Sequence, residues 1–160
     1  MKGLKAATLI FGIFSFAVAQ AGVFEDKTDR FTGVRSVAWQ TIPSEAESFA
    51  VTTAAYYSKG SPTPNEYVFE IITYADTSQF AGCPYVDWLI DGEPAPDLKT
   101  QYSSESTSSA TIERFAMRPD RATLTKLASA KLVEFKVCNV ESSIGSDDMA
   151  GLRKVLTETK

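Results

Sequence analysis

The chain has 160 residues, 44% of them hydrophobic, with no histidine and a formal net charge of −4 at pH 7. The absence of histidine excludes Ser-His-Asp and Cys-His catalytic systems and histidine-based zinc sites. Two cysteines are too few for a four-cysteine zinc site, and the nine glycines form no phosphate-binding or dinucleotide-binding motif. The composition therefore favours a non-enzymatic protein that needs no cofactor and no metal.

The N-terminus has the layout of a secretory signal peptide. Two lysines precede an almost unbroken apolar run over residues 6–18, and small residues place cleavage after Ala19 or Ala21. At about 13 residues, the run is shorter than the roughly 20 that a membrane-spanning helix needs. We expect residues 1–21 to be removed and residues 22–160 to form a single exported β-rich domain, in a periplasm or outside the cell.

The predicted exported domain is acidic. Removing the signal peptide leaves 14 basic and 20 acidic residues, a net charge of −6. This charge argues against nucleic acid and anionic lipid as partners, and it permits a basic protein partner. No other segment is long and apolar enough to span a membrane.

Both cysteines, Cys83 and Cys138, belong to the predicted exported domain. Because exported proteins enter an oxidising compartment, we expect a disulfide between them; the alternative is two buried thiols. Such a bridge closes a loop of about 55 residues and contributes roughly 3–4 kcal/mol by restricting the unfolded chain.

The first half of the domain shows short β-rich segments separated by turn-forming residues. The clearest is Glu66–Ala75, which is apolar on both faces and therefore predicts a central strand; the Pro/Gly-rich segment before it predicts a hairpin. The other strands expected here are Phe31–Ile42, Phe49–Tyr57 and Tyr85–Ile90, with loops at Glu25–Arg30 and Asp76–Pro84 and a turn at Ser44–Glu47.

The second half predicts two helices among further strands. Asp120 is placed to cap a helix that buries Leu124, Leu127 and Ala128, and Ser146 with its acidic neighbours starts the last helix. The strands expected here are the edge strand Leu98–Tyr102, then Ala110–Arg118 and Leu132–Val140, with an exposed hairpin loop at Ser103–Ser109.

These elements predict a mainly β fold. Six to seven strands, joined mostly by hairpins, favour an antiparallel β-sandwich or a curled sheet covered by two short helices in the C-terminal third. An α+β arrangement is the alternative.

The acidic group Asp87, Asp91, Glu93 and Asp97 is the best candidate for catalysis. Two carboxylates held several ångströms apart can hydrolyse a glycosidic bond, and four can bind calcium weakly. The simpler interpretation is that they solubilise a turn beside a strand end, so we assign no catalytic and no metal-binding residue.

Aromatic residues gather in the middle of the chain, where exposed rings can form a binding platform. The candidate binding surface consists of Phe80, Tyr85, Trp88, Asp91 and Glu93. The alternative for Trp88 is a place in the core.

The sequence thus predicts an exported, non-enzymatic binding module of unknown ligand, such as a protein-binding or inhibitor-like domain, whose partner is a protein or an envelope component. The alternatives are a carboxylate-dependent glycan hydrolase and a structural envelope protein. The sequence leaves the oligomeric state open.

Overall fold

The computed structural model describes residues 22–41 and 49–159, which form two antiparallel sheets and two helices. The larger sheet has the order β1 (Val23–Thr28), β2 (Arg35–Gln40), β3 (Ala50–Tyr57), β4 (Glu66–Ala75), β8 (Thr111–Met117) and β7 (Gln101–Ser106). The smaller sheet has the order β10 (Val140–Ser143), β9 (Val133–Val137), β5 (Val86–Ile90) and β6 (Glu93–Pro94). The helices are α1 (Arg121–Ser129) and α2 (Ser146–Glu158). The predicted signal peptide and the predicted turn at Ser44–Glu47 lie outside the described residues.

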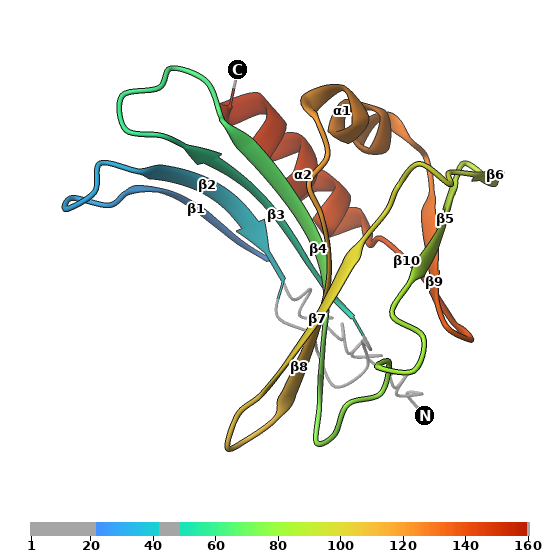
Figure 1. Ribbon diagram of the computed structural model, residues 1–160. Helices are drawn as coiled ribbons and strands as arrows, with labels where there is room; N and C mark the ends of the chain where they lie inside the picture. The colour runs from blue at the N-terminus through green and yellow to red at the C-terminus, as the bar shows by residue number, and fades with distance from the viewer. Residues whose placement is uncertain (1–21, 42–48, 160) are drawn as a thin grey trace, which may run out of the picture.

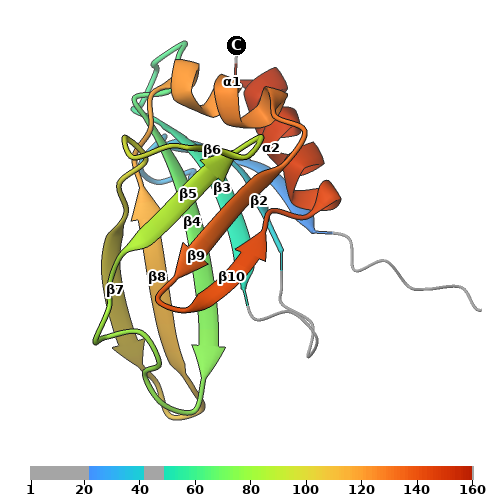
Figure 2. The ribbon, with the colours of Figure 1, turned by 90° about the vertical axis from the view of Figure 1, so that its right-hand side faces the viewer.

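The smaller sheet and both helices cover one face of the larger sheet (Figures 1 and 2). Helix α2 packs on β2 and β3. The smaller sheet contributes Trp88, whose ring centroid lies 6.1 Å from that of Phe69, and Phe135, 5.1 Å from Phe49. The mainly β, two-sheet fold with helices in the C-terminal third is therefore confirmed. Neither helix in the described part of the chain has the length and hydropathy that crossing a membrane requires.

Helix α1 begins as the sequence predicts. The Asp120 side chain accepts a hydrogen bond from the Thr123 backbone N–H at 2.7 Å, and Leu124, Leu127 and Ala128 are buried. Helix α2 differs in its first residue, because Gly145 rather than Ser146 is the N-cap and makes no side-chain cap. The acidic Asp147 and Asp148 still occupy the first turn, where negative charge is favourable.

The two helices satisfy each other's C-terminal carbonyl groups. Arg121, in α1, donates to the carbonyl of Leu156 at 2.7 Å and to that of Thr159 at 2.8 Å. In return, Arg153 of α2 donates to the carbonyl of Ala128 at 2.8 Å. Since the last carbonyls of a helix lack intrahelical donors and carry partial negative charge, both arginines stabilise the helix pair.

The predicted strand Leu132–Val140 contains β9 and a tight turn, and its last residue already begins β10. The chain reverses at Cys138, which has a positive φ of 57°, and the strands on either side pair with each other. The predicted disulfide between Cys83 and Cys138 is present, with Cα atoms 5.7 Å apart. The turn residue of this hairpin is therefore also the residue that bridges to the loop before β5.

Two polar segments predicted as loops are edge strands of the larger sheet. The predicted loop Glu25–Arg30 falls mostly in β1, and the predicted first strand begins only at Arg35 because Phe31 to Val34 form the hairpin connection. The predicted loop Ser103–Ser109 falls largely in β7. An edge strand pairs on one side only and exposes much of its surface, so it needs no apolar pattern, and charged residues there discourage edge-to-edge association.

The contact between α2 and β2 gives a prediction in which helix propensity and packing oppose each other. Gly151 lies in the middle of α2, and a Cβ at this position would overlap the Trp39 indole. Gly151→Ala raises helix propensity by about 1 kcal/mol, but overpacking costs roughly 1–3 kcal/mol. We expect the free energy of unfolding of the variant to fall by up to about 2 kcal/mol in a urea-unfolding measurement.

In a Trp39→Leu background, where the overlapping ring is absent, Gly151→Ala should instead be neutral or stabilising. A Gly151→Ala protein more stable than the wild type would show that Trp39 does not require the glycine.

Candidate functional site

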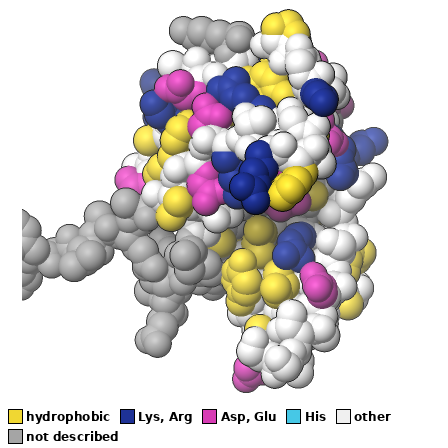
Figure 3. All heavy atoms as spheres, turned by 90° about the vertical axis from the view of Figure 1, so that its left-hand side faces the viewer, with side chains coloured by type: hydrophobic (Ala, Val, Ile, Leu, Met, Phe, Trp, Pro, Cys, Tyr) yellow, Lys and Arg dark blue, Asp and Glu magenta, His cyan; other side chains and the backbone are white. Residues whose placement is uncertain are grey.

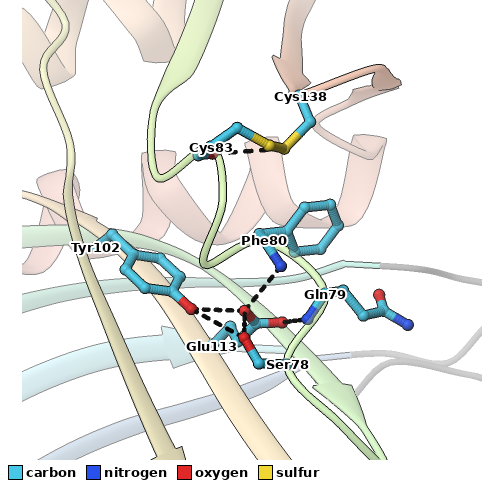
Figure 4. The surroundings of a disulfide bond; sticks show 7 residues. All are labelled: Ser78, Gln79, Phe80, Cys83, Tyr102, Glu113 and Cys138. Carbon is cyan, nitrogen blue, oxygen red and sulfur yellow. Dashed lines mark hydrogen bonds between the residues drawn. A yellow bond between two sulfur atoms is a disulfide. The ribbon is translucent and has the colours of Figure 1, made fainter.

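The loop between β4 and β5 is fixed by a buried carboxylate. Glu113, on β8, is fully buried, and its two oxygens accept four short hydrogen bonds (Figure 4). The donors are the Ser78 hydroxyl at 2.8 Å, the Gln79 N–H at 2.8 Å, the Phe80 N–H at 3.0 Å and the Tyr102 hydroxyl at 2.6 Å. The loop thus closes around a charge that the larger sheet supplies.

These hydrogen bonds determine the charge state of Glu113. Burial by itself raises the pKa of a carboxyl group, because it disfavours the charged form. The hydrogen bonds from Tyr102, from the Gln79 and Phe80 N–H groups and from Ser78 act in the opposite direction, and together they hold the pKa of Glu113 below its ordinary value. Glu113 is therefore an ionised anchor whose oxygens are occupied by the loop.

The disulfide fixes the same loop at its other end. Cys83 lies three residues after Phe80, and its bond to Cys138 ties the loop to the β9–β10 hairpin of the smaller sheet (Figure 4). The chain enters β5 directly after this point. The start of β5 is therefore positioned from both sheets at once.

An open groove of about 520 Å³ runs beside β5. One wall is β5 itself, and the other is the segment that leaves β6 and leads toward β7. The lining residues are Tyr85, Val86, Asp87, Trp88, Leu89, Pro94, Ala95, Pro96, Leu98, Lys99 and Thr100.

The groove exists because β6 stops pairing with β5 after two residues. The last ladder contact is the Ala95 N–H donating to the Trp88 carbonyl at 2.9 Å. The chain then turns away, with the Leu98 N–H donating to the Ala95 carbonyl at 3.1 Å. Pro96 occupies the second position of this turn, where its fixed φ is favoured. The edge of β5 before Trp88 is consequently left open.

The open edge presents unpaired backbone groups. Backbone groups of alternate residues point to the same side of a strand in an antiparallel ladder, so those of Val86 point to the same side as those of Trp88. No strand in the described ranges pairs with Val86 on this side. Its N–H and carbonyl therefore face the groove as a template for another strand.

Two side chains that line the groove also carry unsatisfied polar atoms. Trp88 is only 3% exposed, and its indole Nε1 has no hydrogen-bond partner within the part of the chain that the structure describes. The same holds for the Thr100 hydroxyl. An unpartnered buried donor is costly, and a ligand that accepts from it removes the cost.

The residues of the predicted binding surface are divided by the structure. Phe80 and Trp88 are buried, with 6% and 3% exposure, because their rings pack on Phe49, Phe115, Phe69 and Phe135 in the core. Tyr85 is 55% exposed and lines the groove. Two of the five residues predicted for this surface therefore have rings that face inward.

The first residue of the turn after β5 has a structural role. Asp91, at a positive φ of 52°, accepts hydrogen bonds from the backbone N–H groups of Lys131 at 2.8 Å and Leu132 at 2.9 Å. Glu93 is exposed and lines a second cavity, which reaches the end of α1. The structure thus places Glu93 beside the groove but not in it.

The four candidate carboxylates are distributed over three cavities, and two of them share one. Asp87 lines the groove, Asp91 and Glu93 line the cavity near α1, and Asp97 lines another beside the start of α1. The described residues contain no group of three or more Asp, Glu, Cys or His side chains able to hold a metal ion. Asp91 and Glu93 share a cavity, but the Asp91 carboxylate already accepts the Lys131 and Leu132 N–H groups, so this pair gives little support to a paired-carboxylate hydrolase.

The sequence interpretation missed Val86, Lys99 and Thr100 as site residues. Pro94 and Pro96 were the available signal, because prolines this close to a strand limit the ladder it can form with its neighbour. The unpaired edge that results is a consequence of the turn geometry at Ala95, which no periodicity reveals.

Comparison with protein-family models, with curated proteins and with solved structures finds no match for this chain. A functional proposal therefore depends on the chemistry of the groove and on the groups in it that lack partners.

The buried carboxylate predicts a specific acid sensitivity. Because the folded-state pKa of Glu113 is lowered, its stabilisation is complete above the ordinary value of 4.5 and is lost as the pH falls below it. Glu113→Gln replaces one carboxylate oxygen by an amide NH2 group, which cannot accept the hydrogen bonds that the loop donates. The substitution should lower the free energy of unfolding by about 2–3 kcal/mol at neutral pH. The measurement is urea unfolding between neutral and acidic pH.

Glu93→Gln, at an exposed carboxylate, is the control and should leave the unfolding free energy within about 0.5 kcal/mol of wild type. If Glu113→Gln matched the wild type at neutral pH, the carboxylate would not be what holds the loop.

Proposed function

We propose that this protein is an exported, non-enzymatic binding module that receives an extended segment of a partner protein in the groove beside β5. The partner is a protein exported with it or a component of the envelope, since the N-terminal sequence predicts a secretory signal peptide. The observation that carries the proposal is the open edge of β5 at Val86 inside this groove.

An extended peptide fits both the shape and the chemistry of the groove. It adds a strand to a sheet edge through its backbone, and the groove walls then contact alternate side chains. The volume of about 520 Å³ lies in the range of ligand-binding clefts, and the lining combines apolar residues with a few polar groups.

The groove is held in place before any ligand arrives. The disulfide and the Glu113 carboxylate fix the chain that leads into β5, and the turn at Ala95 fixes the opposite wall. A preformed site loses less conformational entropy on binding, so more of the interaction free energy appears as affinity.

Charge gives a weak preference among peptides. Asp87 and Lys99 both line the groove, so it offers one group of each sign to a ligand. The net charge of −6 expected for the exported domain raises the association rate of a basic partner. It acts at long range and not through contacts in the groove itself.

The proposal predicts distinct effects for two similarly exposed tyrosines. Peptides are selected from a random display library against the immobilised protein, and their affinities are measured by fluorescence polarisation. Tyr85→Ser, in the groove, should weaken binding about ten-fold, because truncating an aromatic contact removes its buried area. Tyr74→Ser, on the outer face of β4 and 50% exposed against 55% for Tyr85, should have no effect.

A second variant tests the backbone. Val86→Pro removes the N–H that faces the groove and leaves the hydrogen bonds to β9, which come from the alternate residues, in place. The variant should not bind the peptides, and its NMR amide signals outside β5 should remain those of the folded protein. In the wild type, peptide binding should shift the NMR signal of the Trp88 indole N–H. Selected peptides that bind Val86→Pro as well as wild type would overturn strand addition at this edge.

A further inference from the structure

The tip of the β1–β2 hairpin, residues 29–34, exposes the most solvent-accessible large apolar side chain of the described chain. Phe31 is 82% exposed, whereas the next, Tyr85, is 55% exposed. Figure 1 shows this hairpin reaching outward on the side of the molecule opposite to β5 and β6. The tip and the groove are therefore separate surfaces.

The tip is rigidly built. The Asp29 carboxylate accepts hydrogen bonds from the Phe31 N–H at 2.7 Å and the Thr32 N–H at 2.8 Å. The Gly33 N–H donates to the Asp29 carbonyl at 2.8 Å, and Gly33 has a φ of 73° that suits glycine. Phe31 is consequently held out into solvent by a hydrogen-bonded loop, not by a loose one.

Two cations flank the exposed ring. The Arg30 guanidinium lies 4.7 Å from the Phe31 ring centroid, and the Lys59 side chain lies beside Gly33. Neither cation forms an ion pair with any residue in the described ranges. The acidic group of the tip, Asp29, is turned inward onto the backbone. Figure 3, which faces this side of the molecule, shows basic side chains beside apolar and acidic ones.

This combination fits a phospholipid surface better than a protein interface. A stable protein interface needs about 800 Å² on each partner, whereas the large apolar side chains exposed at the tip are Phe31 and Val34 alone. A single aromatic ring with adjacent arginine and lysine suits the membrane interface, where the ring enters the headgroup region and the cations meet phosphate groups.

We propose that the β1–β2 hairpin tip is a peripheral membrane contact, in which Phe31 enters a phospholipid headgroup layer while Arg30 and Lys59 bind its phosphate groups. The net charge of the domain is negative, but it is a sum over the whole surface, and the Debye length of about 8 Å makes the charges nearest the tip decisive. Docking by the tip leaves the groove on the far side, open to a partner. This proposal does not depend on the proposed function of the groove.

The test is flotation of the full chain with vesicles of phosphatidylcholine alone and with roughly 30% phosphatidylglycerol added. Because the apolar N-terminal segment would itself bind vesicles, the readout is the ratio between variants with the same N-terminus. Phe31→Ser should lower partitioning about ten-fold on both compositions. The double variant Arg30→Ala, Lys59→Ala should lose most of the increase in vesicle partitioning that phosphatidylglycerol gives. The expected loss is about five-fold for each cation removed.

Tyr74→Ser is the matched control, because it removes an exposed aromatic ring elsewhere and should change nothing. Phe31→Trp adds an exposed indole whose fluorescence should shift to the blue with vesicles and be quenched by brominated lipid, which reports contact at the tip itself. Equal partitioning of Phe31→Ser and wild type, or no spectral shift for Phe31→Trp, would overturn the proposal.

Discussion

The described structure depends most directly on one buried negative charge. Glu113 projects from β8 into the space between the sheets, and Tyr102 and the loop of Ser78 to Phe80 surround it with donors. An isolated carboxylate there would be expelled or protonated, so the loop and the charge require each other. The loop in turn determines where the chain crosses from the larger to the smaller sheet.

The disulfide adds a second constraint on the same crossing. Cys138 sits at the turn of the β9–β10 hairpin, so the bond to Cys83 joins the entry to β5 with the end of its neighbour β9. The smaller sheet is thereby held over the larger one at the end where its edge is open. A groove beside an unpaired strand edge is stable in this fold because three fixed points surround it: the carboxylate, the disulfide and the turn at Ala95.

How much the sequence predicts differs between central and edge elements for a physical reason. Glu66–Ala75 is predicted with its observed bounds, because a strand covered on both faces must be apolar throughout. Strand β1 is missed and β7 is predicted only at its first two residues, Gln101 and Tyr102, since an edge strand with a solvated surface has the composition of a loop. Of the residues predicted to form a binding surface, Phe80 and Trp88 turn inward, because burial of an aromatic ring depends on what packs over it.

The sequence by itself determined the β3–β4 hairpin, the cap of α1 at Asp120 and the partners of the disulfide, because each follows from local chemistry or from the presence of only two cysteines. Tertiary structure alone decided that Glu113 is buried and charged, that β5 keeps an open edge at Val86 and that Phe31 stands in solvent. These properties arise from contacts between segments far apart in the chain. A carboxylate, a strand edge or an aromatic ring acquires its role only when its neighbours are in place.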